Sequence, residues 1–446
     1  MDAAPDRGKD LLPRALTRLT PGRKMGGTVP TWKKSLYAIW VAELLAIVGF
    51  NVSIPILPFY LGELGVSDPG ALKVWVGLAQ TAGAVTLAVF SPIWGSLADS
   101  YGRRLMLLRS MFGGMVVLAL MGFVSSPWQL IVLRAAQGAL TGTIGAATVL
   151  VASITPEEEL GYGLGLLQTA VFAGASLGPL IGGTLSDAFG YRLPFWVTGV
   201  LLGAAGTIVL LLVKEDFRPS APRGTARARL FPDLSLLTRS PGLLGLLLSV
   251  ATVQVANSVV GPILPMFIQS LAPSSDLIGS TTGIILGSAA ISGAVASALV
   301  GKLSHRIGYR RALILCVVGS CLLYIPQAFV RSVGALLALR VIGALFLGGT
   351  SPTVNATIAG LTERANHGVV YGLSASISSV GMSLGPMIGA AVGVAWGFPA
   401  VFLTTAGILF LSAVSLVHGS TIAGVLRGRV RLSADPGRRA ADRAKR

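Results

Sequence analysis

Two segments of this chain are nearly identical: GASLGPLIGG at residues 174–183 and GMSLGPMIGA at residues 381–390, which lie 207 residues apart. The same offset relates PILP at residues 55–58 to PILP at residues 262–265. A common offset of close to half the chain indicates a duplication, because unrelated segments do not keep one spacing. The chain is therefore predicted to fold as two tandem halves of similar structure.

Both halves consist largely of apolar runs. Hydrophobic residues make up 53% of the chain and charged residues only 12%, and the mean hydropathy is +0.75, which excludes an ordinary soluble protein. A helix needs about 20 apolar residues to cross a bilayer, and the sequence contains twelve such runs. They begin near Ser35, Ala71, Arg104, Pro127, Tyr162, Pro194, Pro241, Leu277, Arg310, Val333, Gly368 and Phe398.

The formal net charge of +17 would suggest a nucleic-acid partner if the basic residues formed one patch. They are instead concentrated in both tails, in the connection between the halves and in the turns around Arg103, Arg306 and Arg364. Such clustering on one side is typical of cytoplasmic loops. Three basic residues lie in loops on the opposite side: Lys73, Arg192 and Arg331. We therefore expect a multi-pass protein of the inner or plasma membrane, surrounded by the lipid bilayer, with both termini cytoplasmic and no nucleic-acid partner.

The repeat and the polar segments divide the chain into five parts. Residues 1–32 are a predicted cytoplasmic tail without the features of a signal peptide. Residues 33–215 and 241–420 are predicted six-helix bundles, joined by a cytoplasmic linker at residues 216–240, and residues 421–446 are a basic cytoplasmic tail. The expected fold is an all-α membrane protein with twelve transmembrane helices in two pseudo-symmetric bundles. Because a site between two rigid bundles opens to either side when one rocks against the other, this is transporter architecture.

The sequence shows no nucleotide-binding loop, catalytic triad or cluster of metal ligands. The two cysteines, Cys316 and Cys321, lie on different faces of one predicted helix, so neither a disulfide nor a metal site is expected. We expect a protein that is not an enzyme and that holds no cofactor.

The turn between the second and third spans reads GSLADSYGRR at residues 95–104. It resembles the loop signature of the major facilitator superfamily, G-x-L-A-D-R-x-G-R-R/K, with Ser100 in place of Arg. The resemblance implies a tight turn and a conformational latch between helix ends, formed by Gly95, Asp99, Gly102 and Arg103. The first half thus has the acid that an ionic latch needs, Asp99. The corresponding turn of the second half has His305 in its place, so an ionic latch is expected in the first half and not in the second.

Residues 174–183 match every defined position of G-x-x-x-G-P-x-x-G-G, a signature of the antiporter branches of that superfamily. The matching residues are Gly174, Gly178, Pro179, Gly182 and Gly183. Glycines four residues apart let another helix approach closely, and a proline removes a helical hydrogen bond so that the span can bend. The resemblance implies an antiporter hinge and export, although the same residues would also serve helix packing alone.

Arg134 with Gln137 and Gly138 on the fourth span is similar to the family's R-x-x-x-G element, which is associated with proton coupling. A charge within a bilayer is costly, so Arg134 and its counterpart Arg340 need partners or water. We expect a coupling role for Arg134, with a side chain that reaches the outer surface as the alternative. For Arg340 we expect a side chain that extends to the outer surface.

Glu43 is the one carboxylate that the predicted spans place well inside a helix, roughly 12 Å deep. Desolvation disfavours the charged form of a carboxylate, so Glu43 is a natural proton carrier. A direct pair with Arg134 is not predicted, because a vertical gap of roughly 9 Å separates the two. The alternative is a side chain that reaches water at the inner surface.

Helical spacing places Glu43, Ile47 and Phe50 on one stripe of the first span, and the offset of 207 carries that stripe to Gln254 and Asn257 of the seventh. In this superfamily both spans line a central cavity. The resemblance therefore implies a substrate cavity lined by Ile47, Phe50, Gln137, Gln254 and Asn257. The alternative is that the amides join helices within one bundle.

From Trp32 to about Ser415 the resemblance sharpens to MdtG-type multidrug resistance proteins. The segments that carry it are WKK at 32–34, PILP at 55–58, LMLLRS at 105–110, PIL at 262–264 and AVFLTTAG at 400–407. It implies a monomer that exports amphipathic drugs or similar small molecules in exchange for protons by alternating access. Two alternatives remain open: a dedicated exporter of a single metabolite or siderophore, and a membrane sensor or assembly partner that does not transport.

Overall fold

The computed structural model describes residues 30–215, 241–361 and 367–433, and the regular structure of these residues is helical. The N-terminal half contains α1 (Thr31–Val52), α2 (Leu57–Glu63), α3 (Pro69–Tyr101), α4 (Arg103–Met121), α5 (Pro127–Leu140), α6 (Thr143–Ile154), the 3-10 helix η1 (Glu157–Glu159), α7 (Leu160–Phe189) and α8 (Leu193–Leu212). The C-terminal half contains α11 (Pro241–Val260), α12 (Leu264–Leu271), α13 (Ile278–Ile307), α14 (Tyr309–Gln327), α15 (Val333–Leu347), α16 (Thr350–Leu361) and α17 (His367–Ser433). The linker predicted at 216–240, residues 1–29 of the predicted N-terminal tail and residues 434–446 of the predicted C-terminal tail lie outside the described residues, and α17 continues through the first half of the latter tail.

The helices account for the twelve predicted crossings. Ten stretches of the described residues are long and apolar enough to cross a membrane, and the bent pair Gly245–Val260 and Leu264–Leu271 adds an eleventh. The stretch Leu373–Val417 has 45 residues, about twice what one crossing needs, and Gly397 interrupts it with φ of +79°. Glycine tolerates this φ because it has no Cβ, so α17 turns there and supplies two crossings. The predicted twelve-helix fold is confirmed.

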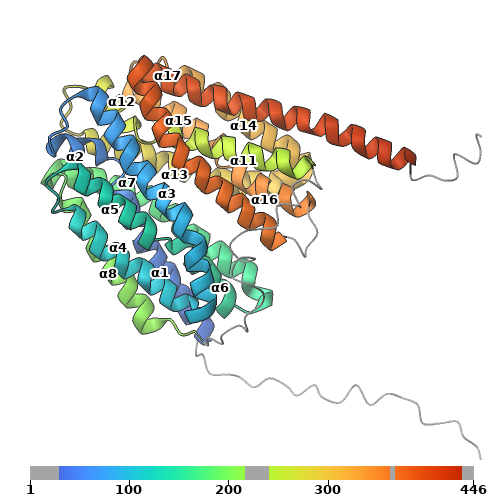
Figure 1. Cartoon of the computed structure of the whole chain (residues 1–446), viewed down its shortest axis with the longest axis horizontal. Helices are drawn as coiled ribbons and strands as arrows, with labels where there is room; N and C mark the ends of the chain where they lie inside the picture. Colours follow the sequence, from blue (N-terminus) through green and yellow to red (C-terminus); the bar gives the residue numbers. More distant parts are fainter. Residues whose placement is uncertain (1–29, 216–240, 362–366, 434–446) are drawn as a thin grey trace, which may run out of the picture.

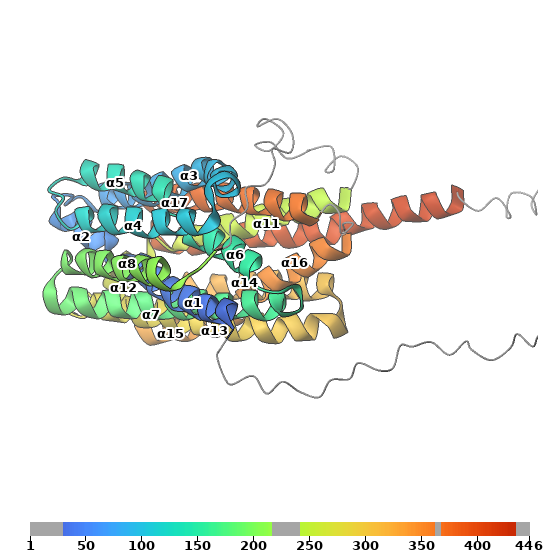
Figure 2. The same cartoon turned by 90° about the horizontal axis from the view of Figure 1, so that it is seen from below.

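The helices form two bundles, one from each half of the chain (Figure 1). Each bundle has its own apolar core, with Leu107 and Phe195 fully buried in the first and Leu264 and Phe402 in the second. The long helices of both bundles run in one general direction, as helices that cross a single bilayer must (Figure 2). The bundles lie together near α2 and α12 and diverge toward α6 and α16 (Figure 1). We call these the closed end and the open end.

The duplication seen in the sequence is reproduced in hydrogen bonds. Thr86 Oγ1 donates to the carbonyl of Ala135 at 2.8 Å, and 206 residues later Ser292 Oγ donates to the carbonyl of Val341 at 2.7 Å. These bonds join the second to the fourth span and the eighth to the tenth. A hydroxyl inside a bilayer stabilises helix pairing when it finds a partner on the neighbouring helix. The two halves are therefore built on one scaffold.

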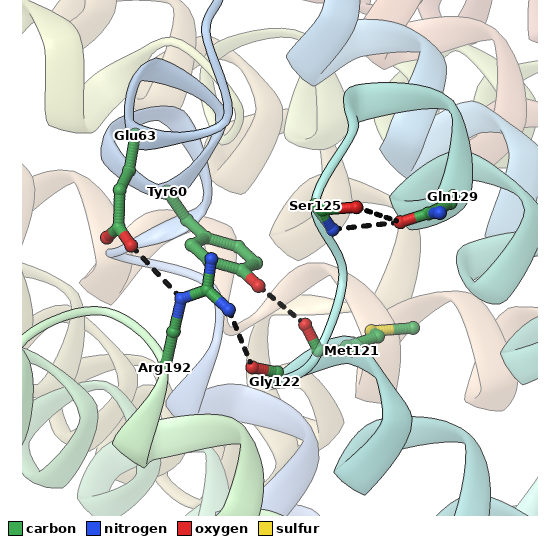
Figure 3. A network of polar contacts seen from close by, with 7 residues as sticks. All are labelled: Tyr60, Glu63, Met121, Gly122, Ser125, Gln129 and Arg192. Atoms are coloured by element: carbon green, nitrogen blue, oxygen red, sulfur yellow. Dashed lines mark hydrogen bonds and ion pairs between the residues drawn. The ribbon is translucent and has the colours of Figure 1, made fainter.

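Polar contacts brace the closed end of the N-terminal bundle (Figure 3). Tyr60 Oη donates to the carbonyl of Met121 at 2.7 Å. Arg192 forms an exposed ion pair with Glu63 at 3.1 Å and donates from Nη1 to the carbonyl of Gly122 at 3.4 Å. These contacts attach α2 and the start of α8 to the end of α4, so this end of the bundle is a single unit.

Candidate transport site

Four spans are interrupted, at corresponding places in the two halves. The breaks separate α1 from α2, α5 from α6, α11 from α12, and α15 from α16. The break before α6 occurs at Gly142, whose φ is +117°. Glycine adopts this φ readily, whereas a residue with a Cβ would be strained there. Helix breaks at matching positions of a duplicated membrane protein leave backbone groups free for ions and ligands. The polar side chains around these four breaks are therefore the candidates for a transport site.

Glu43 lies beside the break in the fourth span. Its side chain is 0% exposed, and its Oε1 accepts a hydrogen bond from Thr143 Oγ1 at 3.0 Å. Thr143 is the first residue of α6, so the carboxyl lies near a helix N-terminus, which favours negative charge. Glu43 Oε2 has no hydrogen-bond partner. The carboxyl is thus buried inside the N-terminal bundle with one hydrogen bond.

Arg134 joins the fourth span to the break in the first. Its Nη1 donates to Gln137 Oε1 and its Nη2 to Ser53 Oγ, both at 3.1 Å, whereas its Nε has no partner. Ser53 caps the C-terminal end of α1 and is fully buried. Arg134 and Glu43 therefore have different, uncharged partners.

The other residues predicted to line the substrate cavity have neighbours within their own bundle. Ile47 is 5% exposed and packs against Gly174 of α7, and half-buried Phe50 packs near Gly114 of α4. The amides of the seventh span bond to each other, with Asn257 Nδ2 3.4 Å from Gln254 Oε1. Asn257 Oδ1 is buried without a partner. Ile47 and Phe50 thus contact helices of their own bundle, and an acceptor on α11 is free to receive a donor.

A pocket of about 350 Å³ lies where α7 meets the C-terminal bundle. Its wall includes Phe172 of α7, Ala290 of α13 and Ala344 of α15, and its polar groups include Tyr324, Gln327 and Arg340. Arg340 Nη1 donates to Tyr324 Oη at 3.3 Å. Arg340, which we expected to reach the outer surface, is partly exposed and lines this pocket. Tyr324 and Gln327, two polar residues in the apolar run of α14, were the signal that the sequence analysis missed.

The five residues of the predicted hinge place α7 against two helices. A Cβ added at Gly174 would lie 2.7 Å from Ile47 Cβ, and one at Gly178 would lie 2.6 Å from the Val48 carbonyl oxygen, so both glycines are required for the approach of α1. Gly182 meets the backbone of α1 in the same way, whereas Gly183 meets the backbone of α13, and the carbonyl of Pro179 contacts Gly283 of α13. The motif therefore joins the first span to the other bundle.

The predicted latch lies at the open end. Gly102 joins α3 to α4 with φ of +101°, and Gly308 does the same in the second half with φ of +89°. The backbone N–H groups of Arg103 and Arg104 donate to the carboxylate of Glu215 at 3.1 and 2.8 Å. Gly95 has no neighbour within 4 Å of its Cβ position, and the side chain of Asp99 lies outside the described set. Glu215 thus caps α4, a role that the sequence analysis did not assign.

The closed end is held by contacts between the bundles. Asp187, at the end of α7, accepts hydrogen bonds from the backbone N–H groups of Gly279 at 3.0 Å and Ser280 at 2.7 Å, in the first turn of α13. On the other side Lys73 Nζ donates to the carbonyl of Gly393 at 2.7 Å. Burial and the nearby carboxylates of Asp187 and Glu63 raise the pKa of Tyr191. We call Asp187 and its two donors the closed-end latch.

Comparison with known proteins gives the family. The model of the Major Facilitator Superfamily matches residues 39–272 and 246–420, which together cover both bundles. This chain belongs to the major facilitator superfamily. The multidrug resistance protein MdtG of Dickeya zeae (strain Ech586) is 35% identical over 391 residues, which are 87% of this chain and 95% of the relative. MdtG of Klebsiella pneumoniae (strain 342) is 35% identical over 383 residues, 86% of this chain and 92% of the relative. The predicted resemblance to MdtG-type proteins is confirmed.

Solved structures of major facilitator proteins share the fold. A bacterial homolog of the human lysosomal transporter Spinster, in an inward-facing and occupied conformation, aligns with a TM-score of 0.73 at 16% identity over 89% of this chain and 98% of that one. The human organic anion transporter MFSD10 aligns with a TM-score of 0.67 at 19% identity over 87% of this chain and 100% of that one. The family model and the MdtG relatives, rather than these structures, identify this chain as a multi-pass membrane transporter and not an enzyme.

Proposed function

We propose that this protein exports amphipathic small molecules in exchange for protons, by alternating access between its two bundles. The observation that carries the proposal is the carboxyl of Glu43, which is fully buried inside a membrane-spanning bundle with a single hydrogen bond. An ionised carboxylate without a cationic partner costs several kcal/mol in such surroundings. Glu43 therefore holds a proton in this conformation, and for exchange it must release that proton toward the open end as substrate enters there, before the bundles close over the substrate.

The hinge residues connect this carboxyl to bundle movement. Ile47, one helical turn from Glu43, packs against Gly174 of α7, and α7 also contacts α13 of the opposite bundle through Gly183. A shift of α13 relative to α7 therefore acts on the helix that carries the proton. Similarity to MdtG proteins supports multidrug substrates.

The distribution of charge supports an orientation. Arg103 and Arg104 are the first residues of α4, and Arg310 and Arg311 lie in the first turn of α14. Both helices begin where the preceding long helix ends at the open end, and basic residues favour the cytoplasmic side. We place the open end and both termini in the cytoplasm, in the cytoplasmic membrane of the cell, and the protein acts as a monomer. The conformation is then the inward-open one, from which cytosolic substrate is taken up.

The experiment is ethidium efflux from cells that express the wild type, Glu43→Gln, Asn257→Ala or the control Glu158→Gln, with and without a protonophore. Glu158 is an exposed acid of η1, so its variant carries the same change of charge outside the membrane. We expect protonophore-sensitive efflux in the wild type and the control, loss of efflux in Glu43→Gln and slower efflux in Asn257→Ala. Wild-type efflux that persists in Glu43→Gln would remove Glu43 from the mechanism, and no wild-type efflux of any unrelated dye would contradict multidrug export.

A further inference from the structure

The pocket between α7 and the C-terminal bundle is electrically asymmetric. The residues that line it in the described part of the chain include one cation, Arg340, and no carboxylate. Arg340 Nε is buried without a hydrogen-bond partner, and the neighbour of Nη1 is the neutral phenol of Tyr324. A guanidinium inside a membrane protein is costly unless an anion or water accompanies it. The missing partner indicates that the pocket receives one.

The pocket contains two further polar features besides Arg340, an amide side chain and a helix N-terminus. Gln327 is 1% exposed, and its Oε1 has no partner although its Nε2 donates to the carbonyl of Leu323. Ser351 and Gly348 line the pocket at the break before α16, so the N-terminal end of that twelve-residue helix borders the same space. A helix N-terminus carries partial positive charge. The cation, the amide and the helix end thus all border this cavity, and of the three the cation and the helix end favour an anion.

Much of the remaining lining is apolar. It includes Phe172 and Ala175 of α7, Ala289 and Ala290 of α13, and Leu347 of α15. A volume of about 350 Å³ lies at the lower end of the range of small-molecule sites. The shape and chemistry match a molecule with a compact hydrocarbon part and one charged end.

We propose that this pocket is a substrate subsite that binds the negatively charged head of an amphipathic carboxylate through Arg340, with the hydrocarbon part against Phe172 and the alanines of α13. The subsite rests on the proposed export function and adds to it a substrate class and a location. Its residues come from α7 and from α13 to α16, none of which contributes to the cavity predicted between α1, α5 and α11. Because α7 belongs to the other bundle, a ligand in the pocket contacts both bundles at once.

The test is binding to the purified full-length protein in nanodiscs, measured by equilibrium dialysis with empty nanodiscs to subtract partition into lipid. The probes are 2-naphthoate and its neutral amide, 2-naphthamide, which share one ring system and differ in charge. Arg340→Gln should weaken 2-naphthoate by at least about tenfold, as expected when a charged hydrogen-bond partner is removed, and should change 2-naphthamide by less than about threefold. Phe172→Ala should weaken both probes alike, by roughly tenfold, because it removes apolar contact area.

The control is Arg331→Gln, which removes one positive charge from the exposed loop before α15 and should leave both affinities unchanged. If Arg340→Gln does not fold, Arg340→Lys keeps the charge but loses the planar fork that matches a carboxylate, and it should weaken 2-naphthoate selectively. Equal losses for both probes in either variant, or no loss for 2-naphthoate, would overturn the proposal. So would a wild-type protein that does not bind 2-naphthoate.

The subsite and the export function fail separately. Selective 2-naphthoate binding without protonophore-sensitive dye efflux would preserve the subsite and refute the proposed function. Dye efflux by a protein that does not bind 2-naphthoate would preserve the function and refute the subsite.

Discussion

The closed-end latch makes a quantitative prediction about the balance between conformations. Asp187 on α7 accepts two hydrogen bonds from the first turn of α13, at 3.0 and 2.7 Å, across the boundary between the bundles. These bonds exist only while the two helix ends are together. Removing these bonds therefore destabilises this conformation. It does not change the free energy of a conformation in which the two helix ends have separated.

The magnitude follows from the two bonds. A hydrogen bond to a charged group contributes about 1.5 kcal/mol at the low end of its range, a value suited to the half-exposed carboxylate of Asp187. The pair then contributes about 3 kcal/mol. Asp187→Asn keeps one acceptor and one neutral bond worth about 1 kcal/mol, so the variant loses about 2 kcal/mol. That loss shifts the ratio of closed to separated ends about 30-fold.

The assay is a distance measurement between spin labels on cysteines introduced at Ser67 and Ser274, which are exposed in closed-end loops of the two bundles. Both native cysteines are buried and should not compete for the label. Asp187→Asn should add or enlarge a population with a longer label-to-label distance. Asp276→Asn, which neutralises an exposed acid at the same end, is the matched control. A distance distribution unchanged from the wild type, or an equal shift in the control, would refute the latch.

Three further predictions concern single contacts. Gly178→Ala should lower stability by about 1–3 kcal/mol because its Cβ would overlap α1, whereas Gly165→Ala on the same helix meets nothing within 4 Å and should be neutral or stabilising; thermal unfolding in detergent compares them. Thr143→Val removes the hydrogen bond to Glu43 and should slow dye efflux several-fold, whereas Thr148→Val, which loses only a bond within α6, should not. Glu63→Gln breaks an exposed ion pair and should cost less than about 1 kcal/mol, with the melting temperature and the efflux rate nearly unchanged.

The number and position of the spans could be predicted because each depends on local properties of the sequence. The starts expected near Arg104, Pro127, Leu277 and Val333 lie within one residue of the observed helices, since a bilayer fixes the length of an apolar run and glycine or proline marks its ends. The hinge motif was also readable, because close helix approach requires glycines at a fixed spacing.

The partners of polar side chains could not be predicted. Asp187 lies 92 residues from Gly279, and nothing local in the sequence indicates which helix N-terminus an acid at a span end will reach. The depth of Arg340 could be estimated from its position in the span, but its partner Tyr324 depends on the packing of α14 against α15. Sequence position gives the depth of a charge, and tertiary packing gives its partner.

The two halves share a scaffold but differ in the chemistry they place on it. Arg134 and Arg340 are separated by the repeat offset of 206, yet Arg134 bonds to Ser53 and Gln137, whereas Arg340 faces a pocket. At the position that corresponds to Glu43 the second half has Val250, which is buried and cannot carry a proton. The proposed proton site thus belongs to the first bundle and most of the proposed substrate subsite to the second. The helix that contacts both proposed sites is α7, through Gly174 toward α1 and through Phe172 into the pocket. If protons are exchanged for substrate as proposed, α7 is the helix through which the two sites are connected, and a variant that stiffens it should uncouple the two events before it abolishes either.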